Sequence, residues 1–118
     1  DGNKNAYFYL GLLYNDEGKY DLAEEYYKKA IDEGSKNALN NLAMIYMDQE
    51  KYDLAEECYK MAVVKNVKGS VYNLANLYYI LEKYDLAKRY YTIAAQEGDA
   101  DAWEMLRIIE LEVSKVYY

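Results

Sequence analysis

Side chains that could carry out a reaction are scarce in this sequence. It contains no histidine, which is the commonest general base and the commonest metal ligand among protein side chains. Its single cysteine, Cys58, therefore has no histidine to activate the thiol, and no internal disulfide can form. Glu24 and Glu25, like Glu56 and Glu57, are sequence neighbours on expected helices and point apart. We expect no catalytic residue, no metal site and no cofactor, and hence a protein that is not an enzyme.

A second set of side chains is suited to binding. Asparagines and apolar residues recur at i, i+3, i+7 and i+10 in four segments, so each group lies on one side of a helix. This stripe consists of Asn5, Phe8, Leu12 and Asn15; Asn37, Asn40, Met44 and Met47; Gly69, Tyr72, Asn76 and Tyr79; and Asp101, Glu104, Ile108 and Leu111. Asparagine amides can pair with the backbone of an extended peptide, and apolar residues form pockets for its side chains. The alternative is that these residues serve packing alone.

The charges around the stripe restrict its partner. The stripe contains no lysine or arginine, whereas Asp16, Asp48, Asp101 and Glu104 lie in or beside it, which favours a neutral to basic protein or peptide with apolar anchors. The residues expected to contact this partner are Asn5, Phe8, Leu12, Asn37, Asn40, Met44, Met47, Tyr72, Asn76, Tyr79, Glu104 and Ile108. A net charge of -7 disfavours nucleic acid and anionic membrane surfaces as partners. The longest apolar run is also too short to span a bilayer.

An internal repeat determines which elements position the stripe. The pentapeptide Lys-Tyr-Asp-Leu-Ala begins at Lys19, Lys51 and Lys83, at intervals of 32 residues. The same interval relates Leu10, Leu42, Leu74 and Leu106, as well as Ala30, Ala62 and Ala94. Apolar residues within each copy have helical spacing, for example Ala6, Leu10, Leu13 and Tyr14, and the sequence contains no proline. Each copy is therefore expected to form two helices.

Most of the tyrosines belong to this repeat. Nine of the 17 occupy three columns that are expected to pack between helices, namely Tyr14, Tyr46 and Tyr78; Tyr20, Tyr52 and Tyr84; and Tyr27, Tyr59 and Tyr91. The pairs Glu24 with Lys28, Glu25 with Lys29 and Glu56 with Lys60 have the favourable i,i+4 order, and we interpret them as a solvated face without a function.

Turn residues mark the helix boundaries. Gly2, Gly34, Asn66 and Gly98 share one repeat position and tolerate the left-handed conformation that ends a helix. The N-caps expected next are Asn3, Ser35 and Asp99, whereas Val67 breaks the pattern and predicts a looser junction. Within the repeats, Gly18 is replaced by Glu50 and Glu82, at a cost of about 1 kcal/mol each if the position requires positive φ.

Spaced residues of the second copy, Leu42, Ala43, Tyr46, Ala55, Tyr59 and Ala62, match the pattern of the tetratricopeptide repeat, and the chain resembles this family over nearly its whole length. It is two residues shorter than the family at the junction between copies, where Ala94 to Ala102 is similar to the Sel-one-like repeats. The resemblance implies an all-α, right-handed solenoid whose first helices line a concave surface. One domain would comprise repeats at 3–34, 35–66 and 67–98 and a capping helix at 99–118.

The resemblance also bears on the partner. Chaperone-binding members hold a partner's C-terminal carboxylate with basic side chains and asparagines, but Phe8, Gly69 and Asn73 stand where basic residues should be. Asn41 and Asn73 resemble the asparagine ladder of the O-linked sugar transferase.

We therefore expect a cytoplasmic protein-binding scaffold. The alternative is a structural spacer, or a module that self-associates through apolar surface at its N-terminal end. Because residues 1–6 align with residues 33–38, we expect a fragment of a longer chain.

Overall fold

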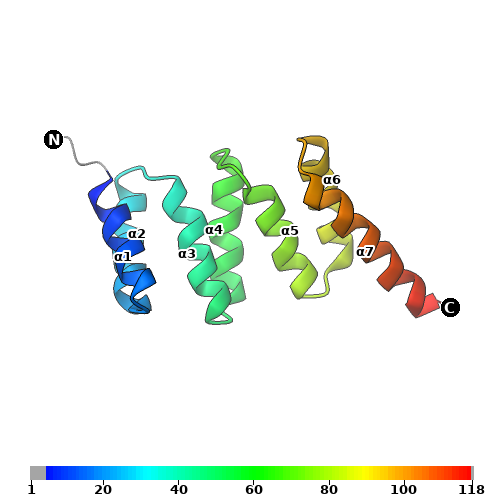
Figure 1. Cartoon of the computed structure of the whole chain (residues 1–118), viewed down its shortest axis with the longest axis horizontal. Coiled ribbons are helices and arrows are strands. Elements are labelled where there is room, and N and C mark those ends of the chain that lie inside the picture. The colour runs from blue at the N-terminus through cyan, green and yellow to red at the C-terminus, as the bar shows by residue number, and fades with distance from the viewer. Residues whose placement is uncertain (1–4, 118) are drawn as a thin grey trace. The chain divides into compact units, whose positions relative to one another are not determined.

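The computed structural model describes residues 5–117, and the side chains of residues 5–115, as an all-α protein (Figure 1). The chain divides into two compact units, with the division between Val67 and Lys68. The first contains α1 (Ala6–Asp16), α2 (Tyr20–Asp32), α3 (Asn37–Asp48) and α4 (Tyr52–Val64). The second contains α5 (Ser70–Ile80), α6 (Tyr84–Gln96) and α7 (Ala100–Tyr117). The predicted turn at Gly2 and cap at Asn3 lie outside the described residues.

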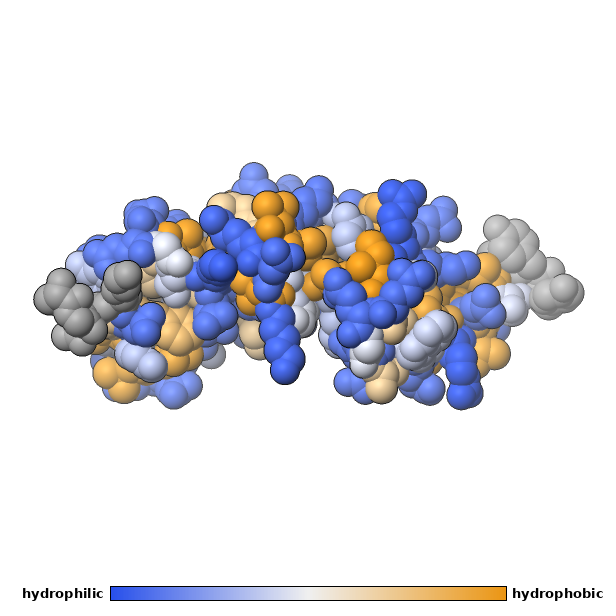
Figure 2. Space-filling view, turned by 90° about the horizontal axis from the view of Figure 1, so that it is seen from above, coloured by the Kyte–Doolittle hydropathy of each residue, from blue (hydrophilic) through white to orange (hydrophobic). Residues whose placement is uncertain are grey.

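Consecutive helices pack against one another within each unit. In the first unit α2 contacts both α1 and α3, and α4 contacts α3; in the second, α6 contacts both α5 and α7. Within the units, α2 and α6 thus each contact the helix before them and the helix after them. No helix in the described part of the chain is long and apolar enough to cross a membrane. Separate apolar patches lie among hydrophilic side chains on the face shown in Figure 2.

Each of the first six helices ends in the same hydrogen-bonded turn. In the turn after α3, the Glu50 amide donates to the Met47 carbonyl at 3.0 Å and the Lys51 amide donates to the Tyr46 carbonyl at 2.8 Å. This pair of bonds defines the Schellman motif and requires a left-handed residue. That residue is Gly18, Glu50 or Glu82 within the copies and Gly34, Asn66 or Gly98 between them. The predicted helix ends at Gly34, Asn66 and Gly98 are confirmed.

The predicted starts of the next helices are confirmed only in part. Asp99 caps α7, because its carboxylate accepts a 3.0 Å hydrogen bond from the Asp101 amide. The prediction for Ser35 is wrong: α3 begins two residues later, at Asn37, after Lys36 in the cap position. Val67 provides no cap, and α5 begins only after Gly69, whose φ is 81°.

Small residues allow the paired helices to approach closely. Ala23, Ala30 and Tyr27 of α2 are fully buried. A Cβ added to Gly11 of α1 would lie only 2.6 Å from ring atoms of Tyr27, so nothing larger than glycine fits there without movement. In the second unit, Ala87, Tyr91 and Ala94 form the corresponding buried set on α6.

The three tyrosine columns differ in burial, although the sequence predicts that all of them pack between helices. Tyr27, Tyr59 and Tyr91 are buried as expected, and so are Tyr46 and Tyr78. The column of Tyr20, Tyr52 and Tyr84 is not core: Tyr20 is 43% exposed and the other two are half-buried. These three begin the second helices, where a neighbouring helix covers only part of the ring.

Leu13 shares the helical apolar spacing of α1 but is not a core residue, since 51% of its surface is exposed. Its repeat equivalent on α3, Ile45, is only 2% exposed. The difference arises because α2 precedes and covers α3, whereas the described residues contain no helix ahead of α1.

The left-handed residues predict a stabilising substitution. Glu50 has φ 59°, which is strained for a residue with a side chain, so Glu50→Gly should stabilise the protein by about 1 kcal/mol. The control Glu97→Gly, at a helix end where φ is −85°, should give no gain. Thermal and urea unfolding of the two variants would measure the difference, and an equal effect at both positions would contradict this explanation.

Close helix packing predicts a destabilising substitution. Ala55 of α4 is completely buried, so Ala55→Leu should overpack the helix pair and cost about 1–3 kcal/mol. Ala100→Leu, the same change at an exposed position in the first turn of α7, serves as the control. Urea denaturation would report the two free energies of unfolding, and unchanged stability of the Ala55 variant would rule out tight packing at that position.

Candidate functional site

The stripe of the first unit lies on α1 and α3. None of its residues is buried: Asn5 and Asn37 are exposed at the start of their helices, whereas Phe8, Leu12, Asn15, Asn40 and Met47 are half-buried. Met44 is the most open apolar member, with 54% of its surface exposed. The residues that are buried on α1 and α3 include none of the stripe, so the stripe remains accessible on the surface.

Tyr27 lies directly below this stripe. Its ring centroid is 6.1 Å from that of Phe8, in a tilted arrangement. No group in the described residues meets hydrogen-bond geometry with its buried hydroxyl. Burial raises the pKa of Tyr27, and the side-chain amides of Asn15 and Asn41 oppose that rise. The stripe of the first unit thus covers a buried tyrosine whose polar end is incompletely satisfied.

In the second unit Tyr91 occupies the repeat position of Tyr27, and its hydroxyl has a hydrogen-bond partner within the unit. The Tyr91 hydroxyl donates to Oδ1 of Asn76, and the Tyr72 ring lies 5.6 Å from the Tyr91 ring. Burial raises the pKa of Tyr91. Asn76 is the repeat equivalent of Leu12, whose side chain cannot accept a hydrogen bond. The acceptor that Asn76 provides for the Tyr91 hydroxyl is therefore missing at the equivalent position, Leu12, near Tyr27.

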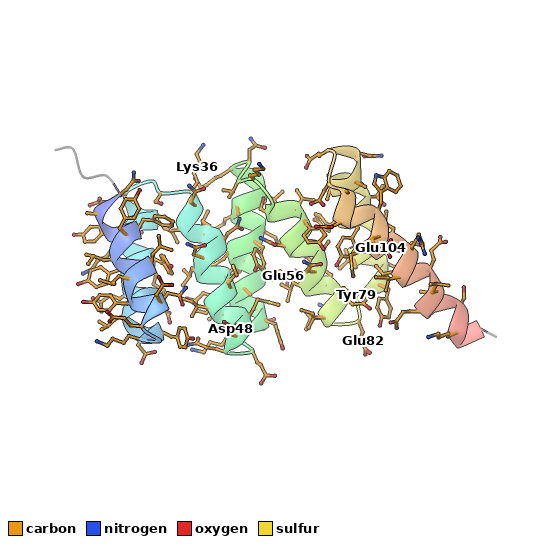
Figure 3. All side chains as sticks on the ribbon, in the orientation of Figure 1. Lys36, Asp48, Glu56, Tyr79, Glu82 and Glu104 are labelled. Atoms are coloured by element: carbon orange, nitrogen blue, oxygen red, sulfur yellow. The ribbon has the colours of Figure 1, made fainter. Side chains whose placement is uncertain are left out.

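The remaining stripe residues of the second unit are partly engaged by α7. Tyr79, labelled in Figure 3, lies near the end of α5. Its hydroxyl donates to Oε1 of Glu112 at 3.3 Å, and its ring centroid is 5.7 Å from that of Tyr84. Burial and the Glu112 carboxylate both raise the pKa of Tyr79. Glu104 is exposed and lies 3.6 Å from the guanidinium of Arg107, while Ile108 is half-buried.

Basic side chains are missing from the first helices of all three copies. The sequences of α1, α3 and α5 contain no lysine or arginine, and their only charged residues are Asp16 and Asp48, at the ends of α1 and α3. Within α1, α3 and α5, the only charges on the same helix as the stripe residues are therefore acidic. Such a surface does not attract an acidic ligand.

One polar cluster was interpreted incorrectly from the sequence as part of a solvated face. The predicted pair of Glu24 and Lys28 does form, at 2.8 Å, but the Glu24 side chain is only 21% exposed and also accepts a 3.0 Å hydrogen bond from the Tyr46 hydroxyl. Burial alone would raise the pKa of Glu24, but the hydrogen bonds from Lys28 and Tyr46 lower it. This cluster joins α2 to α3, and the repetition of tyrosine at this position was the only signal for it.

The reactive side chains offer no site. Cys58 is buried, and burial, assisted by Glu57, raises the pKa of its thiol to about 11, so the thiolate is not populated at neutral pH. No cluster of three histidine, cysteine, aspartate or glutamate residues suited to a metal occurs among the described residues.

Paired helices that repeat every 32 residues, with exposed first-helix faces, define a helical-repeat protein. The chain belongs to the tetratricopeptide repeat family: family models of this repeat match residues 5–33, 37–66 and 69–97. No curated protein sequence matches the chain.

Solved structures share the fold at low sequence identity. The N-terminal domain of stress-induced protein-1 from C. elegans is 18% identical, with a TM-score of 0.80 over 93% of this chain and 98% of that one. The TPR2AB domain of yeast Sti1, in a complex with pHSP90, is 23% identical, with a TM-score of 0.84 over 97% of this chain and 48% of that one. The first TPR of Spaghetti (RPAP3), bound to the HSP90 peptide SRMEEVD, is also 23% identical, with a TM-score of 0.79 over 94% and 95%.

At two equivalent tyrosines, the same substitution is expected to change the stability by different amounts. Tyr91→Phe removes a hydrogen bond and leaves Asn76 without its donor, so it should cost about 1 kcal/mol or more. Tyr27→Phe removes a hydroxyl for which residues 5–115 provide no partner in hydrogen-bond geometry, and it should change the free energy of unfolding by less than about 0.5 kcal/mol. Urea denaturation of both variants tests this, and an equal loss at Tyr27 would mean that Asn15 or Asn41 bonds its hydroxyl.

Proposed function

We propose that this chain is a non-catalytic protein-binding module and that the stripe of the first unit binds an extended peptide segment. The observation that supports this most directly is the exposed Met44, which lies between half-buried apolar side chains and asparagine amides on α1 and α3. Large apolar residues in such a setting act as anchors, and amides pair with peptide backbone. The free thiol of Cys58 is compatible with a reducing setting such as the cytoplasm.

The ligand that suits this surface is neutral to basic and carries apolar side chains. The HSP90 peptide in the RPAP3 complex, SRMEEVD, ends in three acidic side chains out of four. In this chain Phe8, Gly69 and Asn73 stand where chaperone-binding members of the family carry basic residues. With Asp16 and Asp48 at the ends of α1 and α3, an acidic tail would be repelled.

In the second unit we propose a smaller contribution from the stripe. Tyr72 and Asn76 already pack against or bond with Tyr91, and Tyr79 is bonded to Glu112. Their substitution would disturb the unit itself. Glu104 retains an exposed carboxylate that would favour a basic residue of the partner, and Ile108 adds apolar surface beside it.

This proposal predicts which peptides are selected and which methionine matters. A random 12-residue phage library panned on the full chain should yield neutral to basic peptides with apolar residues and micromolar affinity, equivalent to about −8 kcal/mol. Met44→Ser should weaken binding of the selected synthetic peptides at least tenfold by fluorescence anisotropy, because an anchor is lost.

The matched control is Met61→Ser, on the second helix α4, where the methionine is 46% exposed. This variant should bind the peptides like the wild type, and both variants should keep the wild-type melting temperature. Equal losses for both methionines, or selection of acidic peptides, would refute the proposed site. Failure to select any peptide would favour a structural spacer.

A further inference from the structure

Two tyrosines and two glutamates of the second unit lie close together. Tyr79 is near the end of α5, Glu82 lies in the turn that follows, Tyr84 is the first residue of α6, and Glu112 belongs to α7 (Figure 3). The ring centroids of Tyr79 and Tyr84 are 5.7 Å apart, with their planes inclined at 59°. The Glu112 carboxylate accepts a 3.3 Å hydrogen bond from the Tyr79 hydroxyl. We call these four residues the tyrosine-glutamate site.

The negative charge of the tyrosine-glutamate site is not compensated by the described residues. Among residues 5–115, no lysine or arginine forms an ion pair with Glu82 or Glu112, and none lies over either tyrosine ring. Partial burial, Glu112 and Glu82 raise the pKa of Tyr84, and partial burial and Glu112 raise the pKa of Tyr79. Both glutamates are exposed and both tyrosines are half-buried, so this negative potential is accessible to a ligand.

The repeat framework does not require this combination of side chains. In the first unit, the positions equivalent to Tyr79, Glu82 and Glu112 are occupied by Asn15, Gly18 and Asp48. Tyr20 retains the ring of Tyr84, and Asp48 retains a carboxylate. However, Asn15 provides no second ring and Gly18 provides no second carboxylate. The paired rings and paired carboxylates are therefore a particular feature of the second unit.

We propose that the tyrosine-glutamate site binds an arginine side chain of a protein partner. A guanidinium is planar, so it can stack on an aromatic face and donate two parallel hydrogen bonds to a carboxylate. Because the ring centroids are 5.7 Å apart, one cation can lie within about 6 Å of both, which is the range of a cation–π attraction.

The hydrogen bond from Tyr79 prepares the Glu112 carboxylate for this ligand. A carboxylate has several acceptor positions, and Tyr79 occupies only one of them. The bond restrains the Glu112 side chain beside the two rings and leaves acceptor positions for the guanidinium. A lysine fits less well, since its ammonium is a strongly hydrated point charge that cannot form the paired bonds.

Tyr79 also belongs to the stripe, so the arginine would come from the neutral to basic protein segment of the proposed function, and in this respect the inference rests on that proposal. The contacts of the tyrosine-glutamate site all lie within the second unit, whereas Met44 lies on α3 of the first. An arginine probe can therefore test the site without a selected peptide.

The probe is the end-blocked tripeptide Ala-Arg-Ala, titrated into the full chain with isotope-labelled tyrosine rings. The NMR signals of Tyr79 and Tyr84, assigned with the variants Tyr79→Phe and Tyr84→Phe, should shift in a saturable way at millimolar tripeptide. The tripeptide with citrulline, the neutral isostere of arginine, should cause no shift. The lysine tripeptide should bind about threefold more weakly.

Glu112→Gln should weaken binding of the arginine tripeptide about fivefold, because it removes a charge but keeps an acceptor for the Tyr79 hydroxyl. The matched control is Glu110→Gln, at an exposed position on another side of α7, which should bind like the wild type. Both variants should keep the wild-type melting temperature, since neither glutamate is buried.

Three results would overturn the inference: no shift of either tyrosine signal at millimolar arginine tripeptide, equal shifts with citrulline, or equal effects of the two glutamine variants. The outcome is separable from that of the phage selection. Arginine binding without any selected peptide would refute the stripe of the first unit and support this site. Selected peptides that depend on Met44, without arginine binding, would refute this site alone.

Discussion

The close contact between first and second helices is the constraint on which the remaining structure depends. At Gly11 the backbone of α1 lies so near the ring of Tyr27 that even a methyl group would collide with it. Alanines at positions such as Ala43 and Ala55 maintain the same approach in the next copy. Because the large ring fills the space left by the small residues, the helix pair is held in one register. The stripe residue Phe8 packs on the same ring, so the stripe is fixed relative to the helix pair.

The turns that end the helices maintain this register within each unit. A Schellman turn with one left-handed residue ends each of the first six helices. As a result α2, α4 and α6 each begin four residues after the last residue of the helix before them. Glutamate occupies this position twice despite the backbone strain, at Glu50 and Glu82. The pattern shows that packing between helices outweighs a local penalty of about 1 kcal/mol.

Repeat copies that are alike in sequence differ in what their equivalent residues can do. Asn76 bonds the hydroxyl of Tyr91, whereas Leu12, at the equivalent position, offers no acceptor to the hydroxyl of Tyr27. Stripe residues of the second unit consequently contact a buried side chain of that unit. The stripe of the first unit remains accessible to a partner. A binding surface on this scaffold arises where the framework does not use the first-helix side chains for itself.

The sequence by itself determined the family, the helical hairpins and the turn positions, because these depend on local chemistry that recurs every 32 residues. Helical spacing also separated the stripe residues of α1 and α3 from the buried residues of these helices, since none of the stripe residues is buried. The exposure of Leu13 could not be predicted, because the apolar spacing is the same whether or not a preceding helix is present. Likewise, only the tertiary structure revealed that Glu24 joins Tyr46 and that Tyr79 is bonded to Glu112, since these partners lie 22 and 33 residues apart in the chain and meet only when the helices pack.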